Sequence, residues 1–154
     1  MRFILLGLFA ATAFAADPAG FSLWKANELK DLGKALDSQL GPDHAARATL
    51  GDYGNHSVRL LHRVADGTPE MHDEFSDIFI ILGGEGIVVV GGTIANVKSL
   101  VGGRGEYTGT GIDGGENHAI SAGDVIHIPV KAPHEILVPK GKEITYIRVA
   151  IPDK

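Results

Sequence analysis

The chain has 154 residues, and none of them is a cysteine. This absence excludes disulfide bonds, zinc fingers, iron–sulfur clusters and a cysteine nucleophile. Stability must therefore come from the hydrophobic core, or from a bound metal. Because 44% of the residues are hydrophobic, a chain of this length can form one domain with a core of ordinary size.

Positive charge is also scarce, because 14 basic residues face 19 acidic ones and the formal net charge is −5. This balance, without any long basic run, argues against a nucleic-acid surface and against binding to an anionic membrane.

Several sequence motifs of known enzyme classes are missing as well. There is no P-loop and no GxSxG elbow, and the glycines near Gly105 lack the GxGxxG spacing of a dinucleotide site. Nucleotide binding and serine-hydrolase chemistry are therefore disfavoured.

The N-terminus has the pattern of an export signal. Arg2 precedes an apolar run over residues 3–11, and Ala13-Phe14-Ala15 offers small residues at a cleavage site. The apolar run is too short to span a bilayer. We therefore expect export, with a periplasmic or secreted product after cleavage near Ala15. The predicted organisation is a signal peptide at 1–15, an N-terminal helical arm at 16–50 and a barrel at 51–154.

Within the arm, four leucines recur at the spacing of one helical face. They are Leu29, Leu32, Leu36 and Leu40. Asn27 is the expected N-cap, and Gly41-Pro42 the expected stop. We expect this helix to pack on the outside of a sheet or on a second subunit.

After Gly51 the pattern changes to short β-rich segments separated by turn residues, which is typical of an all-β barrel or sandwich. The expected strands cover 57–64, 78–82, 87–90, 118–121, 125–128, 135–138 and 144–151. A glycine-rich stretch at 102–115 is expected to be a long loop, either functional or a surface excursion or dimer arm. Arg104 and Tyr107 are its candidates for touching a ligand.

Two stretches predict a metal pocket. Glu70 and His72 lie two positions apart on an expected strand, so their side chains share one face. An unpaired buried carboxylate is costly, so Glu70 would need a cation or hydrogen bonds. With His134 and Asp77, the set offers two imidazoles and two carboxylates, which suit manganese, iron, nickel or zinc.

These two stretches resemble the motifs of the cupin family. The first aligns as Glu70-x-His72-x4-Asp77-x6-Gly84, and the second as Gly123-x5-Pro129-x-Lys131-x2-His134-x3-Val138. Glu70 stands where the family has its first histidine, and Asp77 replaces a glutamate. Lys131 and Val138 replace a glycine and an asparagine, and the leading glycine of the first motif is not at its usual place.

The resemblance implies a small, single-domain, secreted bacterial cupin. Its fold would be a double-stranded β-helix, that is a jelly-roll barrel, with an N-terminal α-helix. It further implies a homodimer, and a divalent transition metal bound by His72, His134, Asp77 and Glu70. Whether either carboxylate coordinates is left open, because a side chain as short as that of Asp77 has less reach.

The expected function is that of a metal-dependent enzyme, a lyase, isomerase or dioxygenase, acting on a small polar metabolite. The catalytic candidates are Glu70 and His62, either of which would move a proton beside the metal. His118 and His127 are further candidates for lining the pocket. The alternative is a non-catalytic cupin whose pocket holds a small molecule or a metal without turnover.

Overall fold

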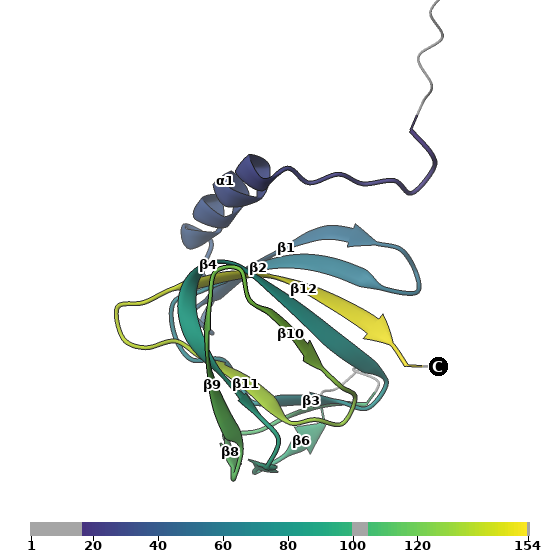
Figure 1. The fold of residues 1–154 in the computed structure, drawn as a ribbon. Coiled ribbons are helices and arrows are strands. Elements are labelled where there is room, and N and C mark those ends of the chain that lie inside the picture. The colour runs from purple at the N-terminus through teal and green to yellow at the C-terminus, as the bar shows by residue number, and fades with distance from the viewer. Residues whose placement is uncertain (1–16, 100–104, 154) are drawn as a thin grey trace, which may run out of the picture.

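The computed structural model describes residues 17–99 and 105–153. The predicted signal peptide and Arg104 lie outside these ranges. One helix precedes a series of antiparallel strands (Figure 1). The elements are α1 (Ala26–Asp37), β1 (Ala45–Asp52), β2 (Ser57–Arg63), β3 (Glu70–His72), β4 (Phe75–Val90), β5 (Thr93–Ala95), β6 (Lys98–Ser99), β7 (Glu106–Thr108), β8 (Gly111–Asp113), β9 (Glu116–Ser121), β10 (Val125–Ile128), β11 (His134–Leu137) and β12 (Ile144–Pro152).

Strand β4 organises the barrel because it takes part in both halves of the main sheet. Its first half pairs with β12 and β10, and its second half pairs with β9 and β11. On one side the sheet continues from β12 to β2 and β1, and on the other from β11 to β3, β7 and β6. The sheet curls so that its two halves face each other (Figure 1). This arrangement confirms the predicted all-β jelly roll with an N-terminal helix.

The curl depends on a bend in β4 at Gly83 and Gly84. Pairing with β12 slips by one residue between Thr145 and Tyr146, and Gly84 has a φ of 76°. A Cβ at Gly84 would overlap the backbone carbonyl of Glu143. Glycine is therefore required both for the positive φ and for the close approach of the neighbouring chain. The sequence predicted two separate strands here, and the structure shows one bent strand.

The two faces of the curled sheet carry two separate hydrophobic clusters. Alternate residues along each strand point to opposite faces, so Leu61 of β2 and Phe79 of β4 pack inside the barrel while Leu60 and Ile147 pack outside. The outer cluster is completed by Leu36 of α1, which is only 2% exposed. Figure 1 shows α1 outside the barrel beside β1 and β2, as the leucine spacing predicted.

The bounds of α1 differ from the prediction. Lys25, not Asn27, is the N-cap, and its backbone N–H donates to the Glu28 carboxylate over 3.3 Å. The helix ends at Asp37, before the predicted stop, and β1 begins at Ala45, inside the segment expected to be a helical arm. Within the described ranges, no helix is long and apolar enough to cross a membrane.

The glycine-rich stretch at 102–115 is not a loop throughout its described part. Strand β7 pairs with β3, with Tyr107 opposite Met71 and Glu106 opposite His72, and β8 pairs with β5. The hydroxyl of Tyr107 donates to the carboxylate of Asp73 over 3.0 Å. Sequence pattern missed these strands because glycine and short length obscure the alternation on which strand prediction relies.

Candidate metal centre

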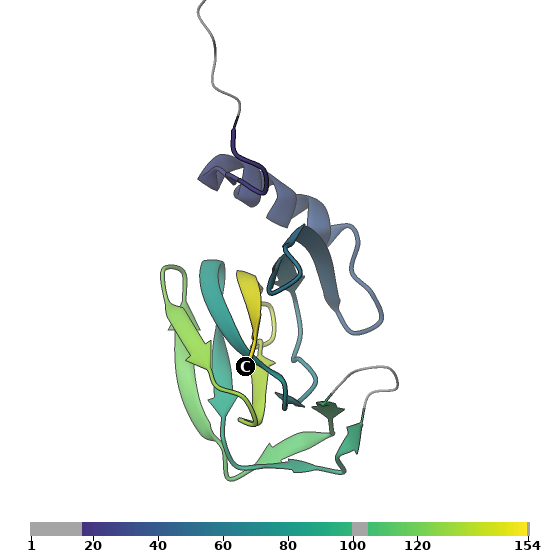
Figure 2. The same ribbon diagram turned by 90° about the vertical axis from the view of Figure 1, so that its right-hand side faces the viewer.

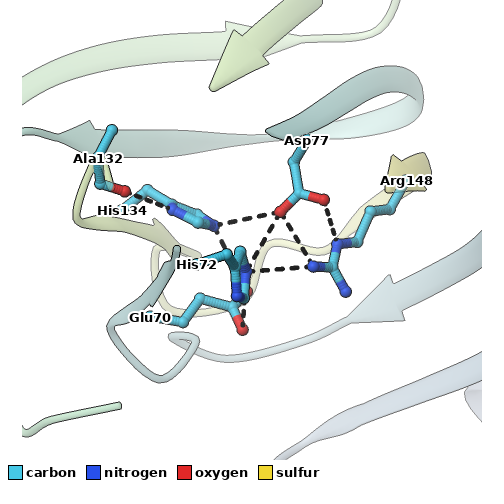
Figure 3. Close-up of polar contacts among 6 residues, drawn as sticks. All are labelled: Glu70, His72, Asp77, Ala132, His134 and Arg148. Carbon is cyan, nitrogen blue, oxygen red and sulfur yellow. Dashed lines mark hydrogen bonds and ion pairs between the residues drawn. The ribbon is translucent and has the colours of Figure 1, made fainter. Parts of the chain in front are cut away.

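Polar side chains from four strands meet inside the barrel. Glu70 and His72 come from β3, His134 from β11, Asp77 from β4 and Arg148 from β12 (Figure 3). Each lies at an inward position: Asp77 shares a face with Phe79, and Arg148 shares a face with Tyr146, which belongs to the inner cluster. His134 is directly opposite Glu70 in the β3–β11 pairing. The fold therefore brings together residues that are far apart in the chain.

His134 is held in the orientation that a metal ligand requires. Its side chain is 2% exposed, and its Nδ1 lies 3.0 Å from the backbone carbonyl oxygen of Ala132. Because a carbonyl can only accept, Nδ1 carries a hydrogen and Nε2 is the nitrogen that a metal could use. Burial acts to lower the pKa of His134, but the neighbouring Glu70 carboxylate raises it above its usual value. This buried Nε2 has no hydrogen-bond partner within the described residues. It lies 3.7 Å from Oε1 of Glu70 and 3.6 Å from Oδ2 of Asp77.

His72 directs its Nε2 toward the same point, although a second group competes for it. The atom lies 3.9 Å from Oε2 of Glu70 and 3.1 Å from Nη2 of Arg148. The guanidinium can only donate, so Nε2 of His72 accepts and carries a lone pair. The ring stacks on Phe75 with the centroids 4.1 Å apart, which fixes its plane.

Glu70, His72 and His134 form a group whose candidate ligand atoms all lie within 4.8 Å of one another. Two imidazole lone pairs and a carboxylate are a donor set that fits a divalent first-row transition ion. Glu70 is the accessible member, with 38% of its side chain exposed. Burial acts to raise its pKa, but His134, followed by Arg148 and His72, acts in the opposite direction and the pKa falls to about 2. Glu70 is therefore ionised at neutral pH, as a metal ligand must be.

Asp77 is engaged by a cation of the chain itself. Its carboxylate is fully buried and accepts two hydrogen bonds from Arg148, from Nε over 2.7 Å and from Nη2 over 3.0 Å. Burial acts to raise the pKa of Asp77, but the neighbouring His72 and Arg148 hold it below its usual value. Oδ2 of Asp77 also lies 3.3 Å from Nε2 of His72. Asp77 thus borders the metal group while being neutralised by Arg148.

Arg148 was not among the residues singled out from the sequence. A signal for it does exist, because Ile144, Tyr146 and Arg148 alternate along one expected strand, and the first two are buried inside the barrel. A charged residue at the next inward position predicts a buried partner of opposite charge. The guanidinium also lies over the ring of Phe75, with its carbon 5.2 Å from the ring centroid.

The other candidate histidines lie elsewhere. His62 shares the outward face of β2 with Leu60, beneath α1, and its Nδ1 lies 2.9 Å from the hydroxyl of Thr145. The structure therefore does not bring His62 to Glu70, and the proton transfer predicted for it has no place inside the barrel. His118 and His127 are exposed on the outer surface. None of these three histidines contributes to the group of ligand atoms.

Comparison with known proteins supports the fold only. No family model matches the sequence, and no curated protein matches it. Among solved structures, KdgF from a Halomonas species is 17% identical with a TM-score of 0.53, and the match covers 75% of this chain and 85% of KdgF. A cupin-2 domain protein of Rhodospirillum rubrum is 17% identical with a TM-score of 0.51, with coverages of 72% and 63%.

The polyketide cyclase RemF of Streptomyces resistomycificus is 16% identical with a TM-score of 0.50, and the match covers 72% of this chain and 66% of RemF. The chain thus spans slightly less than two thirds of the lengths of RemF and the cupin-2 protein. At these identities the likeness shows the fold, which is the cupin fold that the two sequence motifs predicted.

Proposed function

We propose that the protein is a metal-dependent enzyme acting on a small polar metabolite, with the ion held by Glu70, His72 and His134. One observation carries this proposal: the buried Nε2 of His134 has its orientation fixed, has no hydrogen-bond partner and faces a carboxylate and a second imidazole. An unpartnered buried nitrogen is costly, and a bound cation would satisfy it. RemF, a polyketide cyclase, is an example of an enzyme with this fold.

When bound at such a site, a divalent ion polarises a substrate oxygen or activates a water molecule. The protein side chains supply the remaining functions. The carbonyl of Ala132 orients His134, and Phe75 orients His72. Glu70 is the accessible carboxylate of the group, with 38% of its side chain exposed, so it is the residue that would accept a proton from a substrate if it did not hold the ion. We assign the predicted role of proton acceptor to Glu70 rather than to His62, which lies on the other face of the sheet.

Arg148 is the best candidate for orienting a substrate. Its Nε and Nη2 are used by Asp77 and His72, whereas its Nη1 makes no hydrogen bond within the described residues. A guanidinium with one free edge in a partly enclosed site is suited to binding a carboxylate or another oxygen acceptor. This favours an anionic or oxygen-rich metabolite as the substrate, with lyase, isomerase or dioxygenase chemistry as the reaction class.

The first test is elemental analysis of protein purified without chelators and without a histidine tag. We expect nearly one equivalent of manganese, iron, nickel or zinc in the wild type. His72→Ala and His134→Ala should each lose the metal and lower the melting temperature. His118→Ala is the matched control, because this histidine is 57% exposed on the outer surface. Full metal content in both site variants would contradict the assignment.

A non-catalytic binding protein is the second candidate, and one observation favours it. Nη2 of Arg148 lies 3.1 Å from Nε2 of His72 and so occupies the direction of the lone pair that a metal would use. In this alternative, Arg148 and the imidazoles form a polar, metal-free pocket for a small anion. Purified protein that contains no metal and takes up none from added manganese, iron, nickel or zinc would support this candidate over the enzyme.

We also propose export and self-association. Export rests on the signal pattern that ends near Ala15, and mass spectrometry of the product from an exporting host would show whether the first 15 residues are removed. A homodimer rests on the resemblance to cupins and on apolar side chains left exposed outside the barrel, such as Phe21 and Val125 at 56% and 67%. Light scattering coupled to size exclusion would measure the mass.

A further inference from the structure

A groove of about 710 Å³ lies between α1 and the outer face of the barrel, away from the metal group. Figure 2 shows α1 standing outside the strands that it covers. The groove is lined by residues on one face of α1, by residues at the bend of β4 and by residues at the start of β12. A volume of this size is within the range of small-molecule sites, which span about 300–1,000 Å³.

His62 supplies an unsatisfied nitrogen in this groove. The side chain is 3% exposed and lines the groove, and its Nε2 has no hydrogen-bond partner within the described residues. Its Nδ1 lies 2.9 Å from the hydroxyl of Thr145. When Nδ1 donates to this hydroxyl, the lone pair remains on Nε2 and calls for a hydrogen-bond donor.

The group nearest to this nitrogen is the carboxylate of Asp37, whose Oδ1 lies 3.6 Å from Nε2 of His62. That separation is too long for a good hydrogen bond. Asp37 is the last residue of α1, where the helix dipole is negative and an acidic residue is unfavourable. A buried imidazole nitrogen without a hydrogen-bond partner, a carboxylate and a helix C-terminus therefore meet at one place, and the last two favour a positively charged group.

The other end of the groove is apolar. Trp24 and Leu29 line it from the N-terminal end of α1. Leu82, which is 38% exposed, lines the groove nearer His62, because the adjacent Gly83 pairs with Thr145 and Thr145 pairs with His62. The groove follows α1, whose 12 residues span about 18 Å at the usual rise of 1.5 Å per residue. Its shape thus suits an elongated molecule with a charged end and an apolar body.

The remaining charges in the groove are of both signs. Lys30 and Lys34 line it from the helix and Glu143 from the barrel. Both lysines are exposed, so their aliphatic stems can face the groove while their ammonium groups reach water. With Asp37, the lining has two basic and two acidic side chains, and the acidic Asp37 is the one next to the buried imidazole.

We propose that this groove binds an elongated organic amine, with its ammonium group donating to Asp37 beside the buried His62 and its apolar body lying toward Trp24 and Leu29. The site is separate from the metal group and does not depend on the proposed enzymatic activity. It also gives a role to His62, whose burial on the outer face of the sheet has no explanation in the metal centre.

Trp24 makes the proposal directly testable, because it is the one tryptophan in the chain. Octylamine, octan-1-ol and octanoate share one apolar body and differ in the polar end. We expect octylamine at neutral pH to change the fluorescence of Trp24 saturably, and to bind at least tenfold more tightly than the alcohol or the acid. Calorimetry with the same three probes gives an answer even if the fluorescence is insensitive.

Variants separate the polar end from the apolar body. Asp37→Asn should weaken octylamine binding at least tenfold, whereas Asp31→Asn, an exposed change on α1 outside the groove lining, should leave it unchanged. Adding a chelator to the wild type should also leave it unchanged, since the metal group is not involved. Equal binding of amine and alcohol, tighter binding of octanoate, no binding at all, or an unaffected Asp37→Asn variant would each overturn the proposal.

Discussion

Replacing Arg148 by methionine tests the charge arrangement of the candidate site. The guanidinium makes two hydrogen bonds to Asp77, of 2.7 and 3.0 Å, and the two side chains are only 15% and 0% exposed. Methionine keeps an apolar stem of similar length but leaves the Asp77 carboxylate buried without a cation of the chain. Breaking a buried ion pair by removing one partner costs about 3–5 kcal/mol. We therefore expect Arg148→Met to lose about this much free energy of unfolding.

The assay is denaturant unfolding in the presence of a chelator, with the wild type and two reference variants measured alongside Arg148→Met. Asp77→Asn combined with Arg148→Met should lose less stability than Arg148→Met alone, because no buried charge then remains unpaired. Arg47→Met removes a guanidinium from an exposed pair with Asp43, where the hydrogen bond is 2.6 Å long. Exposed pairs contribute below about 1 kcal/mol, so this control should change little.

Metal should rescue the variant. In Arg148→Met, the Oδ2 of Asp77 still lies near the two imidazole nitrogens, at 3.3 Å from His72 and 3.6 Å from His134 in the wild type. A divalent cation bound there would restore the missing positive charge, so added manganese or zinc should stabilise the variant more than the wild type. An Arg148→Met protein as stable as the wild type in chelator, with no further gain from metal, would refute this reasoning.

Three further predictions concern the fold and its pH dependence. Gly84→Ala should destabilise by more than about 2 kcal/mol in denaturant unfolding, because it combines backbone strain at positive φ with a steric overlap. Gly83→Ala is its control, since a Cβ there meets nothing within 4 Å. Leu36→Ala should cost about 2–5 kcal/mol because the side chain is 2% exposed in the outer cluster, whereas Leu23→Ala, at 65% exposure, should leave the melting temperature unchanged. In chelator, the lowered pKa of Glu70, about 2 against 4.5, predicts a stabilising contribution that is complete above pH 4.5. This contribution disappears as the pH falls through about 2. Glu70→Gln should therefore abolish the change in the free energy of unfolding between pH 4.5 and about pH 2 that is due to Glu70, and leave the pH dependence outside this range as in the wild type.

The sequence predicted the fold class because strand alternation and turn residues are local signals. The helix face, the strand at 125–128 and the inward pair of Glu70 and His72 all follow from spacing alone, and the structure has them as predicted. The bend in β4 was missed because the two glycines that permit it also resemble the end of a strand. The bend exists only through the slipped pairing with β12, which is a contact distant in sequence.

The position of His62 shows what separates a correct prediction from a wrong one at the site. A histidine on this strand was predicted to line the pocket. The packing of its neighbours decides which face of the sheet it occupies, because Leu60 packs under α1 and Leu61 packs inside the barrel. Even-numbered positions of β2 from 58 to 62 therefore face outward. The sequence shows that alternate residues of β2 share a face, but it does not show which set faces outward. That assignment depends on how the strand packs against the helix.

The geometry also indicates why Asp77, unlike Glu70, is paired with a cation of the chain. Glu70 and His134 belong to directly paired strands in one half of the sheet, whereas Asp77 and Arg148 belong to paired strands in the other half. Each half of the sheet therefore supplies one carboxylate and one basic side chain. The bend in β4 brings these two pairs together. Oδ2 of Asp77 lies 3.3 Å from Nε2 of His72 and 3.6 Å from Nε2 of His134, so the shorter side chain still reaches both imidazoles. Arg148 already neutralises Asp77, so the site combines three candidate metal ligands with a neighbouring ion pair, and Nη1 of Arg148 makes no hydrogen bond within the described residues.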